Sequence, residues 1–300
     1  MSGAGVTLTC DAKDGLLRVA VWQGKILRDL YLDVFAHPDL SGAIVGGKVA
    51  RVLAGERSAF VDCGLAEKVF LATSDKLHAG QYMTLRLTSP ARQGKAWTGE
   101  RVAFEQATGE AVGVLVEAPA AWQRALEDLK AAAIKSFVFN HRDAYLACRD
   151  WLTAGRTDIV RYTDKEPAHP ELTEIIDALR QPRVALSGGG AIVVETVEAL
   201  TAIDVNAPDA ANPLTVNLLA VREAARQIRL RNLAGIIVID ALKMRQRPDN
   251  AKILNALQKV VAEDPAGAQV FGLTKLGLIE MTRQRRGATL ADCLAKANEA

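Results

Sequence analysis

The pattern of apolar and polar positions predicts two buried β-strands that each end in an aspartate. One strand ends at Ala202–Ile203–Asp204, and the other is the apolar run from Ile236 to Asp240. Short runs of β-branched residues are typical of buried strands, and the ends of such strands often form the site of an α/β protein. Residues 218–233 have the apolar periodicity of a helix, so the two strands could be neighbours in one sheet.

Two carboxylates at neighbouring strand ends would form an oxygen-rich site suited to Mg²⁺. Asn206 lies two residues beyond Asp204 and could join such a site. The alternative is that each aspartate only caps the turn that follows its strand. The residues alone leave both interpretations open.

The first third of the chain has the patterns of short antiparallel strands. Residues 17–22 and 26–32 read as a hairpin with Gln23–Gly24 at its turn. Alternation then continues through residues 47–71, 81–87 and 94–98 with glycines at the turns. Five short strands of this kind fit an OB fold, a small barrel that binds single-stranded nucleic acid.

Helical and strand patterns alternate after this barrel, which indicates an α/β fold. The expected helices are 120–133, 141–152, 171–179, 218–233 and 251–261, and the expected strands are 137–139, 159–162, 269–273 and 277–281. Gly188–Gly190 precedes a strand and lacks the Lys-Ser/Thr of a nucleotide-binding loop. We interpret it as a hairpin turn or as a place where backbone and substrate approach closely.

Composition narrows the class of protein. Hydrophobic residues make up 49% of the chain and charged residues 24%, as in soluble globular proteins. No apolar run is long enough to cross a membrane, and the N-terminus lacks a secretory signal, so we expect a cytoplasmic protein with no membrane partner. The four cysteines are scattered without a CxxC pair, which argues against zinc.

Positive charge is concentrated around the candidate metal site. Between Val221 and Arg286 the chain has 13 Lys and Arg against 6 Asp and Glu, although its net charge is only +2. This local excess suits a polyanionic substrate. Any single member of it could equally belong to a solvated charged face.

Three stretches carry a more specific signal: GGGAIVVETVEALTAIDVN (188–206), NLLAVREAARQIRLRNLAGIIVID (217–240) and GLIEMTRQR (277–285). In order and spacing they resemble the catalytic core of the ribonuclease E / ribonuclease G family. The resemblance implies an α/β fold (α+β, multi-subdomain) in which a ribonuclease-H-like subdomain contains an inserted OB-fold β-barrel and precedes a DNase-I-like catalytic subdomain. The implied bounds are 1–38 and 106–180 for the ribonuclease-H-like subdomain, 39–105 for the barrel and 181–300 for the catalytic subdomain.

The resemblance also implies roles for particular residues. Asp204 and Asp240 match the two Mg²⁺-binding aspartates, and Asn206 matches the asparagine that supports them. Phe60 and Phe70 match positions whose rings stack on RNA bases. Lys95 matches a nearby basic contact of the barrel. The basic region is expected to add further RNA contacts from five arginines: Arg226, Arg229, Arg231, Arg283 and Arg285.

The sequence departs from the family pattern at three places. Glu117–Ala118 stands where an Arg-Thr pair would bind a 5′-monophosphate, so we expect that sensor to be absent. Only Cys293 lies near the C-terminus, so a zinc-linked tetramer is not expected, and a monomer or a dimer would be compatible. Lys243 occupies a position where the family commonly has a second acid, which affects the rim of the metal site.

The sequence therefore predicts a Mg²⁺-dependent endoribonuclease that cleaves single-stranded, AU-rich RNA in RNA processing or decay, independently of 5′-monophosphate sensing. The AU preference is implied by the resemblance only. The alternative is a non-catalytic RNA-binding protein derived from the same family. Lys243 and the missing sensor favour this alternative, whereas retention of Asp204, Asn206 and Asp240 opposes it.

Overall fold

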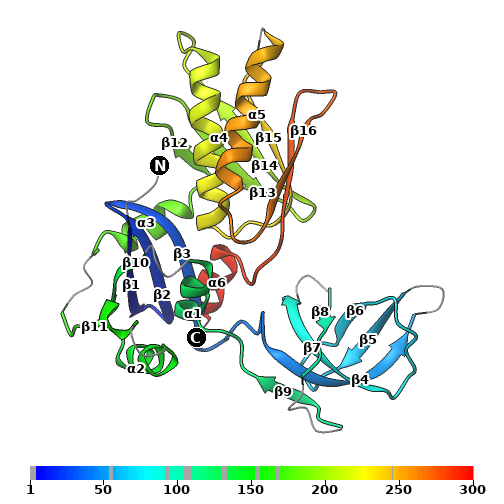
Figure 1. Ribbon diagram of the computed structural model, residues 1–300. Helices are drawn as coiled ribbons and strands as arrows, with labels where there is room; N and C mark the ends of the chain where they lie inside the picture. The colour runs from blue at the N-terminus through cyan, green and yellow to red at the C-terminus, as the bar shows by residue number, and fades with distance from the viewer. Residues whose placement is uncertain are drawn as a thin grey trace.

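The computed structural model describes residues 5–53, 57–91, 95–104, 110–129, 134–152, 156–165, 169–244 and 246–299. Its strands form three sheets, and helices cover two of them (Figure 1). The expected mixed α/β architecture is confirmed. None of the helices in the described ranges is both long and apolar enough to cross a membrane.

The first sheet has five strands, and both of its faces are covered. Across the sheet these are β11 (Val160–Tyr162), β10 (Ile134–Phe139), β1 (Val6–Lys13), β2 (Leu16–Gln23) and β3 (Ile26–Val34). Helices α1 (Ala121–Asp128) and α2 (Arg142–Trp151) pack on one face. Helix α3 (Leu172–Leu179) packs on the other, against side chains such as Trp22 and Leu30. We call this part of the chain the five-stranded subdomain.

The second sheet closes into a barrel. Its strands are β4 (Ile44–Val52), β5 (Ser58–Asp62), β6 (Val69–Ala72), β7 (Tyr82–Ser89), β8 (Trp97–Arg101) and β9 (Gly113–Val116). The order β5-β6-β8-β7-β4 is closed by pairing of β5 with β4, which makes an OB-like five-stranded barrel around an apolar core. Strand β9 adds to β4 outside the ring, so the barrel sheet extends beyond the expected boundary at residue 105.

The third sheet has six strands and carries the candidate metal site. They are, in order, β12 (Arg183–Ala185), β13 (Ala191–Thr196), β14 (Leu200–Asn206), β15 (Gly235–Asp240), β17 (Ile279–Arg283) and β16 (Ala268–Leu273). Helices α4 (Pro213–Leu230) and α5 (Arg247–Val261) pack on one face over a core of Ile, Val, Leu and Ala side chains. We call this part the six-stranded subdomain, and the face opposite the two helices its open face.

The local sequence accounts for the ends of α4. Asn212 caps its N-terminus by accepting hydrogen bonds from the backbone amides of Leu214 and Thr215, and Pro213 occupies the first turn, where no backbone N–H is needed. The preceding Gly188–Gly190 segment connects β12 to β13 as the expected hairpin turn, and Gly189 and Gly190 both have positive φ angles.

Contacts join the five-stranded and six-stranded subdomains. The last helix, α6 (Leu290–Asn298), packs with Leu290 against β3 and α3. Leu230 at the end of α4 joins the same apolar cluster. In Figure 1 the barrel is a separate lobe at the lower right, whereas β14 and β15 lie behind α4 and α5 in the upper part of the view.

Candidate active site

Asp204 and Asp240 are neighbours across two parallel strands. β14 pairs with β15 in parallel, and the register places Asp204 directly opposite Asp240. Neighbouring strands lie about 4.8 Å apart, and residues directly opposite each other point to the same face of the sheet. The expectation that these two strands adjoin in one sheet is therefore confirmed.

Alternation along the strands directs the two carboxylates away from the core. Ile203 and Val205 on β14, and Ile239 on β15, point toward the helices and are nearly inaccessible to solvent. Asp204 and Asp240 consequently point to the open face, where both are exposed. Burial of the flanking isoleucines and valine thus fixes where the carboxylates lie.

Asn206 is coupled to the first carboxylate. Its Nδ2 donates a hydrogen bond of 2.7 Å to Oδ2 of Asp204, two residues earlier on the same strand and face. This bond orients the Asp204 carboxylate and leaves Oδ1 available for another ligand. A bond to an ionised acceptor is stronger than a neutral one, so the orientation is well defined.

The donor set fits Mg²⁺. Mg²⁺ prefers oxygen ligands, keeps several of its waters, and is commonly bound through one or two carboxylates plus substrate phosphates. Asp204 and Asp240 supply such a pair, and Asn206 can add an amide oxygen or hold a water. Among the described residues, no cluster of three or more His, Cys, Asp and Glu could hold a metal. The carboxylate pair is therefore the best candidate for a metal site in the described part of the chain.

The loop after β15 is held by a side chain that sequence analysis missed. Asn217 of α4 is completely buried. Its Nδ2 donates to the backbone O of Leu242 at 2.8 Å, and its Oδ1 accepts from the backbone N of Leu242 at 2.9 Å. Nδ2 also contacts Sδ of Met244 at 3.3 Å. The only sequence signal is one amide on the apolar face of a helix, between Val216 and Ala220.

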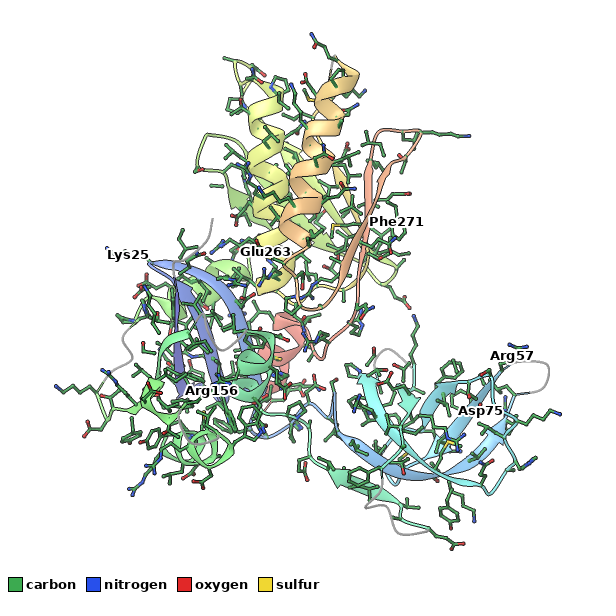
Figure 2. All side chains as sticks on the ribbon, viewed as in Figure 1. Lys25, Arg57, Asp75, Arg156, Glu263 and Phe271 are labelled. Atoms are coloured by element: carbon green, nitrogen blue, oxygen red, sulfur yellow. The ribbon has the colours of Figure 1, made fainter. Side chains whose placement is uncertain are left out.

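The site is an exposed sheet surface and not a closed pocket. A cavity of about 390 Å³ lies between the subdomains, but it is lined by residues such as Tyr31, Asp128 and Arg286 and not by the aspartate pair. On the edge strand β16, Phe271 is 59% exposed (Figure 2), and sequence analysis did not single it out. An exposed surface suits a long polymeric ligand better than a small molecule.

Phe60 and Phe70 form an aromatic pair on the outside of the barrel. They are directly opposite each other on β5 and β6. Their ring centroids are 5.7 Å apart with an interplanar angle of 65°. Their strand neighbours Ala59, Val61 and Val69 are buried in the barrel core, so both half-exposed rings point outward. Lys95, which is exposed, precedes the strand β8 that pairs with β6.

Most of the arginines predicted to contact RNA are paired with other groups inside the protein. Nε of Arg229 donates to Asp29 on β3 at 2.9 Å. Arg231 is buried and donates to the backbone O of Gln181 at 2.8 Å, and burial lowers the pKa of its guanidinium. Arg283 is also buried. Arg226 and Arg285 are partly buried and also have partners. Arg226 forms an ion pair with Glu223, and Arg285 is likewise engaged in an interaction within the protein.

The internal role of Arg283 is equally specific. Its Nε donates to Asp264 at 2.7 Å, and its Nη1 donates to Asn232 and to the backbone O of Leu233, each at 2.9 Å. A guanidinium with this many buried partners joins the sheet to the loop after α5. Arg229, Arg231 and Arg283 therefore present no free cation to a ligand in this conformation.

The segment expected to replace the 5′-phosphate sensor belongs to the barrel. Strand β9 ends at Val116 and pairs with β4. Glu117 follows it and is exposed, and Ala118 packs against the barrel core. At this position the described structure therefore offers a carboxylate and no cationic donor.

The fold and the site together define a mixed α/β protein that combines an OB-like barrel with a paired-carboxylate site on a sheet. The model of the ribonuclease E/G family matches residues 92–286, and the chain belongs to that family. The match includes Asp204, Asn206 and Asp240. It begins after Phe60 and Phe70, so the family match does not cover these two rings.

Curated relatives cover only part of this chain. Ribonuclease E of Nostoc sp. is 36% identical over 185 residues, which are 56% of this chain and 27% of that protein. Ribonuclease E of Synechocystis sp. is 42% identical over 123 residues, which are 39% of this chain and 18% of that protein. Ribonuclease E of Escherichia coli is 37% identical over 151 residues, which are 46% of this chain and 14% of that protein. The chain thus spans about a quarter or less of the length of these relatives.

Proposed function

We propose that this protein is a Mg²⁺-dependent endoribonuclease that cleaves single-stranded RNA. One observation carries the proposal: in a chain of the ribonuclease E/G family, Asp204 and Asp240 lie directly opposite each other on an exposed sheet face. Relatives named ribonuclease E support the reaction class. We also propose the subdomain likenesses to ribonuclease H and DNase I and the divisions near residues 38 and 180, with the barrel part extended to include β9.

The residues have distinct tasks in the proposed reaction. Asp204 and Asp240 would hold Mg²⁺, which would stabilise negative charge on the attacked phosphate and lower the pKa of bound water. Asn206 keeps the Asp204 carboxylate in one orientation through its 2.7 Å bond. Water oxygen forms a bond to phosphorus and the P–O3′ bond breaks, with a proton from the water passing to O3′. The products carry a 5′-phosphate and a 3′-hydroxyl.

The barrel supplies the affinity for a single strand. Phe60 and Phe70 present aromatic surface on which bases can stack, and exposed Lys95 adds a phosphate contact. Stacking on such platforms contributes roughly 1–3 kcal/mol per base and tolerates most sequences. Entry of the RNA would then depend on this surface and not on recognition of a 5′-monophosphate, because Glu117 offers no donor to a phosphate.

A cleavage assay separates this proposal from its alternative. Purified protein is incubated with an end-labelled AU-rich single strand, with Mg²⁺ or with EDTA, and with the same sequence as a duplex. We expect cleavage only of the single strand and only with Mg²⁺. Binding of the single strand without any cleavage would instead support the non-catalytic RNA-binding protein, which the exposed Lys243 beside the site favours.

A further inference from the structure

Two exposed cations lie near the Asp204–Asp240 pair, and neither engages another side chain among the described residues. Arg183 lies on β12, two strands from Asp204 in the sheet, and Lys243 lies in the loop after β15, three residues beyond Asp240. Neither forms an ion pair or a side-chain hydrogen bond within the described residues. They differ in this respect from Arg229, Arg231 and Arg283, whose charges are used inside the fold.

Register places Arg183 in line with the two carboxylates. Arg183 is directly opposite Val193 on β13, Val193 is directly opposite Asp204, and Asp204 is directly opposite Asp240. All four side chains therefore point to the open face. Arg183 is two strands from Asp204, or about 10 Å at the usual strand spacing. Only a valine lies between them, so a guanidinium on its flexible stem can reach a ligand held at the carboxylates.

Lys243 is held in place by its two neighbours. Leu242 and Met244 both pack against the core of the six-stranded subdomain. The backbone N and O of Leu242 are both bonded to the side chain of Asn217, which also contacts Met244. With both neighbours fixed inward, the exposed side chain of Lys243 points outward, three residues beyond Asp240.

The burial of Asn217 is best explained by this loop. A buried amide is costly unless its hydrogen bonds are made. Within the described residues, the Asn217 side chain makes its hydrogen bonds to residues 242 and 244. The fold therefore uses a fully buried polar side chain to fix the position of a short loop. The exposed group that this loop carries beside the carboxylates is the ammonium of Lys243.

Charge balance indicates what the two cations bind. Two aspartates neutralise one Mg²⁺, so the loaded site has no excess charge to attract a polyanion. Each RNA phosphate brings one negative charge. Arg183, in the same row of the sheet, and Lys243, just beyond the end of β15, supply the missing positive charge near the carboxylate pair, where a strand crossing the site would place its neighbouring phosphates.

We propose that Lys243 and Arg183 bind the RNA phosphates on either side of the scissile phosphate, and that Asn217 positions Lys243. The inference rests on the proposed function and adds the residues that hold the substrate across the metal site. The competing explanation is that Arg183 only protects an exposed edge strand from pairing with another chain and that Lys243 is a solvated surface charge.

Cleavage kinetics at several salt concentrations test the two contacts. Wild type, Lys243→Gln, Arg183→Gln and the control Lys259→Gln, an exposed lysine on α5, are compared at fixed Mg²⁺. Each lost phosphate contact should lower kcat/KM by about tenfold at low salt and reduce the slope of log affinity against log salt by about 0.7. The control should match wild type, and Lys243→Arg should retain the wild-type slope.

The positioning role of Asn217 has its own test. Asn217→Asp keeps the acceptor for Leu242 N and removes the donor to Leu242 O, and Asn217→Ser is a second variant if the first is unstable. Either change should lower kcat/KM in the wild-type background and have little further effect in the Lys243→Gln background. Effects that multiply independently in the two backgrounds would overturn the positioning role.

The outcomes distinguish this inference from the proposed function. If wild type does not cleave RNA with Mg²⁺, the proposed function fails. If wild type cleaves, but the salt slopes of Lys243→Gln and Arg183→Gln equal those of wild type and Lys259→Gln, only the phosphate contacts are refuted. The salt dependence of RNA affinity can also be compared among the same three variants, each combined with the inactivating Asp204→Asn, so that no RNA is cleaved during the measurement.

Discussion

Among the arginines predicted to contact RNA, Arg229 gives the clearest test of whether the side chain stabilises the fold or binds RNA. Its guanidinium pairs with Asp29 across the interface between α4 and β3, and the two side chains are only 10% and 8% exposed. Arg229→Ala would leave the Asp29 carboxylate buried without this partner. We therefore expect the variant to lose stability and to keep its RNA affinity.

The structure sets the size of the effect. Removing one partner of a buried ion pair typically costs about 3–5 kcal/mol. Arg28 approaches the other oxygen of Asp29 at 3.3 Å and partly compensates, so the lower end of that range applies. For a chain of this size about 3 kcal/mol corresponds to a melting temperature lower by roughly 5–10 °C.

Thermal unfolding and fluorescence anisotropy with a labelled single strand measure the two quantities. Arg180→Ala is the matched control, because its ion pair with Asp177 is exposed and 3.8 Å long, and such pairs contribute less than about 1 kcal/mol. The double variant Arg229→Gln/Asp29→Asn should recover part of the lost stability. An Arg229→Ala protein that melts like wild type but binds RNA tenfold more weakly would refute this reasoning.

Three further predictions concern other parts of the chain. Phe70→Ala should weaken single-strand binding by about 1–3 kcal/mol, as measured by anisotropy, with little change in melting temperature. Oligonucleotides with 5′-monophosphate and 5′-hydroxyl ends should be cut at rates within tenfold of each other, because Glu117 offers no phosphate donor. Burial raises the pKa of the Cys63, Cys148 and Cys293 thiols to about 12, so these thiols should resist alkylation in the native protein at pH 8. The free energy of unfolding should fall as the pH rises from 9 toward 12, because the thiols ionise in the unfolded chain before they ionise in the folded one.

Local patterns were sufficient to predict that Asp204 and Asp240 end two neighbouring strands of one sheet. The β-branched runs that end at Asp204 and Asp240 indicated strands, and the helix between them allowed a parallel crossover. The structure adds the register, which depends on packing of the whole sheet against α4 and α5 and cannot be read from either strand alone. The outward orientation of Phe60 and Phe70 likewise depends on closure of the barrel.

Contacts between distant segments were beyond sequence reasoning. Charge counting cannot distinguish an arginine in solvent from Arg229, whose partner Asp29 lies 200 residues away. Asn217 gave no motif because its partners are the backbone atoms of Leu242. The expected helix 120–133 is shorter in the structure: α1 spans Ala121–Asp128, Leu129 is already extended, and residues 130–133 lie outside the described ranges.

We propose that the carboxylate pair on β14 and β15 is a metal site for RNA cleavage. The most direct measurement compares cleavage of one labelled single strand at saturating Mg²⁺ by wild type, Asp240→Asn and the control Asp164→Asn, an exposed carboxylate of the five-stranded subdomain. We predict that Asp240→Asn abolishes cleavage while binding RNA within a few fold of wild type, and that Asp164→Asn behaves as wild type. Cleavage by Asp240→Asn at the wild-type rate would contradict the account.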